Sequence, residues 1–231
     1  MEPWQREVTK AQSEVSNYYN GEEYERYKRD EQWYWERCAA MMFFQERDDP
    51  NQVKSVLDVG CGYGTLAVFA KNVFDAPVYA TDYKKRISNE MLNKYGITFL
   101  KSDIEMEDIP FRWPMVFDVI IFTEILEHLY FNPLETLKKL RKRLAPSGVM
   151  YLSTPDAAQW GRVTKWYNHV GEMPLINSYK PDIDEHVYQW SEGELLRIID
   201  ESGFIVEELH FSSPPFWGRH FNMKLRKKEI L

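Results

Sequence analysis

Two glutamates and a histidine lie close together in the segment TEILEHL, residues 123–129. Glu124, Glu127 and His128 directly follow the apolar run VIIF, and they share one face if the segment opens a helix. Two carboxylates and an imidazole can bind a divalent ion such as Mg²⁺ or Mn²⁺. The imidazole can also act as a general base. A structural interpretation stays open beside these, because carboxylates stabilise the N-terminus of a helix.

A further histidine, His186 in DEHVYQW, precedes a predicted late helix. It is a candidate fourth metal ligand beside Glu124, Glu127 and His128. It is also, with His128, a candidate base for a substrate hydroxyl. The candidate catalytic residues are therefore His128, Glu127 and His186.

A glycine-rich turn, VLDVGCGYG at residues 56–64, follows a short β-branched apolar run. Glycines here permit a tight turn and let the backbone approach a ligand closely. Carboxylates end the next two predicted strands, Asp82 in YATD and Asp103 in KSDI. Asp82 can accept hydrogen bonds from both hydroxyls of a ribose, and Asp103 can accept one from an adenine amino group. This order along the chain predicts a nucleoside site at the carboxyl ends of the strands.

The elements that must position these residues alternate between strand and helix, which predicts a doubly wound, mainly parallel α/β sheet. Apolar, β-branched runs predict strands at residues 55–60, 76–82, 96–103, 117–124, 147–155 and 204–211. Helical patterns lie between them at residues 64–74, 83–95, 132–146 and 191–203.

We predict a single domain over residues 1–231 with four parts. They are a helical N-terminal cap (1–50), a ligand-binding core (54–154), an irregular insertion on the substrate side (155–190), and a final helix, strand and tail (191–231). The aromatic segment EQWYWERCAAMMFFQ in the cap is either a helix packed on the core or a lid over a pocket.

Composition limits the possible partners. The formal net charge is −7, which disfavours nucleic acid. No apolar run is long enough for a membrane span, the N-terminus is too polar for a signal peptide, and two cysteines fit a reducing, cytoplasmic setting. The pattern fits a small-molecule substrate, and it leaves the oligomeric state open.

In combination, LDVGCGYG, YATD, KSDIE, FDVIIFTEILEHL and LRKRLAPSGVMYLSTP resemble the class I S-adenosylmethionine-dependent methyltransferases, which have a Rossmann-like seven-stranded sheet. The resemblance implies S-adenosylmethionine as cofactor. It places Asp58 near the methionine amino group, Asp82 at the ribose, and Asp103 at the adenine. The residues it assigns to the cofactor are Asp58, Gly60, Cys61, Gly62, Gly64, Asp82, Tyr83, Asp103, Ile104 and Thr123. A dinucleotide-binding GxGxxG is disfavoured, because Thr65 stands where its third glycine would be. The tail FWGRHFNMKLRKK is short and unusual for the family's last, antiparallel strand, so that strand stays open.

The pattern ExxEH followed by a distant HxYxW resembles two metal-dependent groups, the ubiquinone-pathway O-methyltransferases and the small-RNA terminal 2′-O-methyltransferases. We expect O-methylation of a small-molecule acceptor or of a sugar- or lipid-linked one. Nitrogen and carbon acceptors stay open. The alternatives are metal-dependent 2′-O-methylation of an RNA end, or non-catalytic cofactor binding by a regulatory protein.

Overall fold

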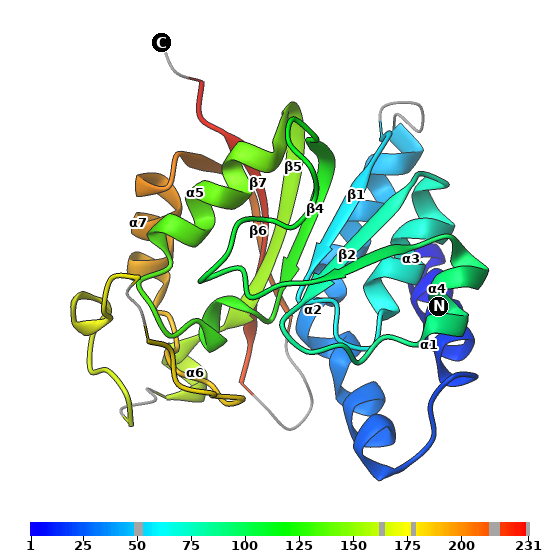
Figure 1. Ribbon diagram of the computed structural model, residues 1–231, viewed down its shortest axis with the longest axis horizontal. Coiled ribbons are helices and arrows are strands. Elements are labelled where there is room, and N and C mark those ends of the chain that lie inside the picture. Colours follow the sequence, from blue (N-terminus) through cyan, green and yellow to red (C-terminus); the bar gives the residue numbers. More distant parts are fainter. Residues whose placement is uncertain (49–52, 162–164, 177–178, 213–217, 230–231) are drawn as a thin grey trace.

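The computed structural model describes residues 1–48, 53–161, 165–176, 179–212 and 218–229. Within them, helices lie on both faces of one seven-stranded sheet with the strand order β3-β2-β1-β4-β5-β7-β6 (Figure 1). The strands are β1 (Val56–Val59), β2 (Val78–Asp82), β3 (Thr98–Lys101), β4 (Phe117–Thr123), β5 (Leu144–Pro155), β6 (Phe204–Ser212) and β7 (His220–Lys227). β1 to β5 pair in parallel, whereas β7 is antiparallel to β5 and β6. The predicted doubly wound, mainly parallel sheet is confirmed.

Side chains alternate along the central strands between two cores. In β4, Val119 and Ile121 belong to the core on the side of α1 and α3, and Ile120 and Phe122 to the core on the side of α5 and α7. Because both faces are covered, these positions must be apolar in succession, and all four are buried. The helices named here are α1 (Pro3–Ser16), α3 (Thr65–Phe74), α4 (Asn89–Tyr95), α5 (Leu134–Arg143) and α7 (Glu192–Glu201).

The long helix α2 (Glu22–Asp48) connects the N-terminal part of the chain to the sheet. It bends at Trp35, whose φ of −121° and ψ of 17° are not helical. Beyond the bend, the Cys38 N–H donates to the side-chain carbonyl of Asn222 on β7 at 2.9 Å, which fastens α2 to the sheet. The predicted helical cap therefore holds α1 and α2, while residues 49 and 50 lie outside the described residues. Its boundary as a separate part stays a prediction.

The last strand of the family fold is present. β7 pairs with β5 and β6 along its length, and its apolar residues Phe221 and Leu225 are buried. The charged residues on either side of Leu225 pair with β6: Lys224 Nζ lies 3.1 Å and Arg226 Nε 3.0 Å from Glu207. The segment that looked unusual for a strand is thus an alternating one, with apolar residues facing the core and cations facing glutamates.

The insertion at residues 155–190 contains α6 (Ala157–Trp160) and η2 (Val170–Glu172). Its two ends meet, because Asp156 and Trp190 form a parallel bridge. Residues 162–164 and 177–178 of the insertion lie outside the described part. Among the described residues, no helix has the length and apolar character that a membrane span requires.

Candidate active site

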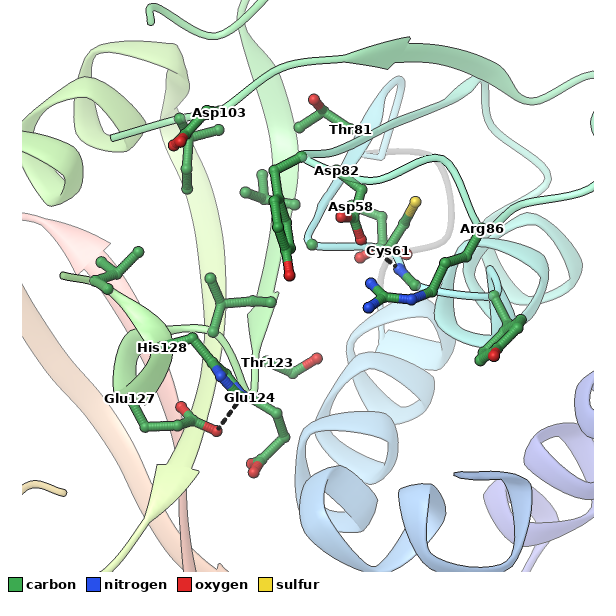
Figure 2. A pocket seen from close by; sticks show the side chains of 18 of the residues that line it. Asp58, Cys61, Thr81, Asp82, Arg86, Asp103, Thr123, Glu124, Glu127 and His128 are labelled. Atoms are coloured by element: carbon green, nitrogen blue, oxygen red, sulfur yellow. Dashed lines mark hydrogen bonds and ion pairs between the residues drawn. The ribbon is translucent and has the colours of Figure 1, made fainter. Parts of the chain in front are cut away.

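A cavity of about 1030 Å³ opens at the carboxyl ends of β1, β2, β3 and β4. Helix α2 and residues 180–186 of the insertion complete its wall. Figure 2 shows two groups of polar side chains around it, with Asp58 and Asp82 beside the β1–α3 turn and Glu127 and His128 at η1 (Leu126–His128). Of the residues predicted for cofactor, catalysis and metal, all line this cavity except Gly64, the N-cap of α3.

The β1–α3 turn depends on two glycines. Gly60 has a φ of +75°, and a Cβ there would lie 2.0 Å from the Ile125 side chain. Gly62 has a φ of +51°, and its N–H donates to Asp82 Oδ2 at 2.9 Å. The turn therefore presents bare backbone to the cavity and is tied to the end of β2.

Two buried carboxylates, Asp58 and Asp82, lie on this side of the cavity. Asp82 accepts backbone hydrogen bonds from Gly62 and, through Oδ1, from Lys84 at 2.9 Å. Burial nevertheless raises its pKa. Burial and the nearby charge of Asp82 raise the pKa of Asp58 to about 7. Asp82 is thus held rigidly by donors, whereas Asp58 is sensitive to any charge that enters the cavity.

At the far end of this side, Asp103 follows β3 and lines the cavity beside Ile104. Its carboxylate is ion-paired with Lys180 of the insertion at 2.8 Å. Lys180 Nζ also lies 2.6 Å from Glu105, whose side chain is only 1% exposed. Sequence reasoning missed this lysine, since nothing in its neighbourhood marks a partner 77 positions away.

Helix α2 adds aromatic and acidic residues that the sequence did not assign to the site. Tyr27, Glu31 and Tyr34 line the cavity. The Tyr19 hydroxyl, from the α1–α2 connection, donates to the Tyr63 carbonyl at 3.1 Å and so holds the glycine turn from outside. The aromatic composition of the predicted cap was the available signal. Within that segment Trp35 is buried, and Tyr34 and Trp35 both line the cavity. Its role as a lid stays a prediction.

Glu124 departs from its predicted place on a helical face. It lies before η1 with a φ of +55°, a left-handed conformation that non-glycine residues seldom adopt. Its carboxylate accepts a hydrogen bond from the Ser153 hydroxyl at 2.7 Å and lies 2.9 Å from His220 Nδ1. Burial opposes ionisation, but the charge and hydrogen bonding of His220 and Ser153 dominate and lower the pKa of Glu124. Glu124 is therefore an ionised partner of His220, and the ligand cluster of the structure does not include it, although it was one of the four predicted metal ligands.

The other three predicted residues do come together. Ligand atoms of Glu127, His128 and His186 all lie within 4.8 Å of one another. Glu127 is fully buried, and its Oε2 accepts a hydrogen bond from the Thr154 hydroxyl at 2.9 Å. Burial and then the charge of Glu124 raise its pKa well above the ordinary value. The pKa of His186 falls to about 4, because burial and the neighbouring His128 disfavour its charge.

The protonation of His128 follows from its hydrogen bond. Its Nδ1 lies 3.0 Å from the Glu185 carbonyl oxygen, which can only accept. In the neutral ring, Nδ1 therefore carries the proton and Nε2 keeps a lone pair. Burial lowers the pKa of His128, so the neutral form prevails at pH 7. Nε2 lies 4.0 Å from Glu127 Oε1 (Figure 2). A neutral imidazole with a lone pair on Nε2 can take a proton or bind a metal ion.

A family model described as a methyltransferase domain matches residues 19–209. The chain belongs to this family and is a class I S-adenosylmethionine-dependent methyltransferase. The ubiquinone biosynthesis O-methyltransferase of Histophilus somni is 23% identical over 193 residues, covering 80% of this chain and 76% of that protein. The malonyl-acyl-carrier-protein O-methyltransferase of Halalkalibacterium halodurans is 28% identical over 127 residues, covering 52% of this chain. The chain spans 46% of that second relative.

Solved structures agree on the fold. The 1,6-didemethyltoxoflavin-N1-methyltransferase of Burkholderia thailandensis, with bound S-adenosylhomocysteine, aligns with a TM-score of 0.60 at 16% identity over 82% of this chain and 77% of that one. An O-methyltransferase of a Brevibacillus brevis multienzyme, also with S-adenosylhomocysteine, gives 0.60 at 15% identity over 82% and 71%. At such low identity these likenesses establish the fold and leave the acceptor open.

Proposed function

We propose that this protein methylates an oxygen atom of a small hydroxylated acceptor, with S-adenosylmethionine as methyl donor and His128 as general base. The observation that carries the proposal is that one cavity is lined by the glycine turn, by Asp82 and by the His128 imidazole, whose Nδ1 is held by the Glu185 carbonyl. The O-methyltransferase relatives support oxygen as the accepting atom.

The residues beside β1 and β2 are suited to the cofactor. Gly62 lacks a side chain where the backbone meets the cavity, and Asp82 is buried with its carboxylate fixed by two backbone donors. Such a carboxylate can accept from both hydroxyls of a ribose. Asp58 lies nearby with one oxygen lacking a hydrogen-bond partner among the described residues, as a site for a cationic group requires. When bound, S-adenosylmethionine supplies an electrophilic methyl group on a sulfonium.

The acceptor side must align a hydroxyl and remove its proton. His128 can take that proton on Nε2, while the Glu185 carbonyl holds Nδ1–H and fixes the ring. Glu124 and Glu127 flank the ring, and the negative charge of Glu124 favours the imidazolium that forms. An acceptor hydroxyl whose own pKa is low, such as a phenol, suits this base best.

The test is a screen of phenols, catechols and vicinal diols, with matched amines, for acceptor-dependent formation of S-adenosylhomocysteine. His128→Gln in an active reaction is expected to lower kcat by about 10²- to 10⁴-fold with little change in KM for the cofactor. His169→Gln, which changes an exposed histidine that does not line the cavity, is the matched control. Turnover of amines alone would overturn the oxygen assignment, and an unaffected His128→Gln variant would overturn the base.

A second candidate adds a divalent metal ion to the same reaction. The clustering of Glu127, His128 and His186 favours it, since one carboxylate and two imidazoles suit Mn²⁺ and related ions and, with more oxygen ligands, Mg²⁺. A metal at these residues would bring Lewis-acid chemistry to vicinal oxygens of the acceptor, whether on a catechol or at an RNA end. Such an RNA-end activity stays a prediction.

Calorimetric titration of Mn²⁺ or Mg²⁺ into metal-stripped protein distinguishes the two candidates. A metal site predicts saturable binding that Glu127→Gln and His186→Gln abolish. Glu124→Gln should keep it, because that carboxylate is engaged by Ser153 and His220. Absence of binding in the parent protein would leave His128 as a base without a metal.

A further inference from the structure

Helix α2 carries a buried carboxylate, Glu31, that the proposed reaction does not use. It is 2% exposed and lines the same cavity as the glycine turn. Its Oε1 accepts hydrogen bonds from Gln12 at 3.1 Å and from the Thr65 hydroxyl at 2.9 Å. Its Oε2 is buried without a well-formed hydrogen bond to any described residue. Burying a carboxylate oxygen without a hydrogen bond costs free energy, and a ligand that donates a hydrogen bond to it lowers that cost.

Asp58, on β1, resembles Glu31 in its burial and in its place in the cavity wall. It is also 2% exposed and lines the cavity, and its Oδ2 likewise lacks a partner among the described residues. The hydrogen bond from Thr65, the first residue of α3, places Glu31 beside the same turn that Asp58 precedes. Tyr27 also lines the cavity, and burial first, then the charges of Glu31 and Asp58, raise the pKa of its hydroxyl, which interacts with the Glu31 carboxylate. The same hydroxyl lies 3.2 Å from the point where a Cβ on Gly62 would stand. Both carboxylates therefore approach the cavity beside the glycine turn.

Two buried carboxylates, each with an oxygen that makes no well-formed hydrogen bond within the described residues, suit a cation that donates hydrogen bonds. A primary ammonium group carries three N–H donors and a full positive charge, so it can donate to more than one carboxylate oxygen. A hard divalent metal ion would require more oxygen ligands than two side chains supply. The chemistry therefore points to an alkylammonium.

We propose that Glu31 and Asp58 jointly bind the α-ammonium group of the cofactor's amino-acid half. This inference rests on the proposed use of S-adenosylmethionine, and it gives α2 a direct part in cofactor recognition. The resemblance to known methyltransferases had pointed to Asp58 alone. With Glu31, the cavity selects the intact amino-acid cofactor against nucleosides that lack the ammonium.

The experiment compares two ligands by calorimetry: S-adenosylhomocysteine and its deamino analogue, in which CH₂ replaces the carbon that bears the ammonium. The parent should prefer S-adenosylhomocysteine. Glu31→Gln should reduce that preference about tenfold or more, while affinity for the deamino analogue changes less than about twofold. Asp58→Asn should reduce the preference in the same way. An undiminished preference in Glu31→Gln, or an equal loss for both ligands, would overturn the inference.

Two comparisons keep the outcome unambiguous. Glu25→Gln removes a carboxylate from an exposed position on the same helix and should leave both affinities unchanged. Binding of the deamino analogue to Glu31→Gln shows that the variant is folded. Failure of the parent to bind S-adenosylhomocysteine would refute the proposed function, whereas normal binding that does not depend on Glu31 would refute only this inference.

Discussion

The ammonium group of Lys180 lies 2.8 Å from the carboxylate of Asp103, and both residues line the cavity. Lys180 belongs to the insertion and Asp103 to the loop after β3, so the contact joins the two walls. Farther along the insertion, Asp184 lies 3.0 Å from Lys84 and 2.9 Å from Arg86, in the loop after β2. Residues 180–184, of which 180–183 line the cavity, are thus ion-paired at both ends.

The first prediction concerns the stability that Lys180 provides. Lys180→Met leaves the buried Glu105 without its countercharge, so the free energy of unfolding should fall by about 1–3 kcal/mol. Lys165→Met, which breaks an exposed pair with Glu185 in the same insertion, should cost less than about 1 kcal/mol. Urea denaturation of both variants makes the comparison. Equal losses would show that the Lys180 pair is no more than a surface contact.

Asp82 should decide nucleoside affinity. Asp82→Asn removes the charge and one acceptor while conserving size, so affinity for S-adenosylhomocysteine should fall by at least about tenfold. Asp118→Asn changes a carboxylate on β4 that accepts a hydrogen bond from Lys54 at 2.8 Å and does not line the cavity. That variant should bind normally. Calorimetry on both proteins tests the ribose assignment, which unchanged affinity in Asp82→Asn would refute.

Strand ends were the part of the site that sequence could predict. An apolar run followed by a polar residue fixes where a buried parallel strand ends, and such ends converge on one edge of a sheet. For that reason Asp58, Asp82, Asp103 and Thr123 could be placed around one cavity before the structure was known, and all four line it.

Contacts that depend on tertiary packing could not be predicted from the sequence pattern. Glu31 meets Thr65 only because α2 packs on α3, and Glu124 meets His220 only because β7 returns beside β5. Neither pair has a characteristic spacing in sequence. The prediction of a shared helical face was wrong for Glu124 for a local reason, since Glu124 itself is left-handed and lies before η1.

Glu31 also makes stability depend on pH. Burial, only partly offset by its hydrogen bonds, raises the pKa of Glu31 from 4.5 to about 7, so the folded protein keeps a proton that the unfolded chain loses. The stabilising contribution of this retained proton to folding is fully present below about pH 4.5 and is lost as the pH rises to about 7. Glu31→Gln should therefore gain stability relative to the parent by roughly 2–3 kcal/mol between pH 5 and pH 8. Urea denaturation of the parent and of Glu31→Gln at pH 5 and pH 8 measures this gain. A stability difference between the two proteins that does not change with pH would contradict the burial argument.

The protonation of His128 can be measured without knowing the acceptor. Burial lowers its pKa, so the ring should lose its charge below the ordinary value of 6.5 and be neutral at pH 7. In the neutral ring, the bond to the Glu185 carbonyl should keep the proton on Nδ1. Long-range ¹H–¹⁵N NMR of histidine-labelled protein reports both properties, and His128→Gln identifies the signal. A neutral ring protonated on Nε2, or a midpoint above 6.5, would remove the free lone pair that the general-base role requires.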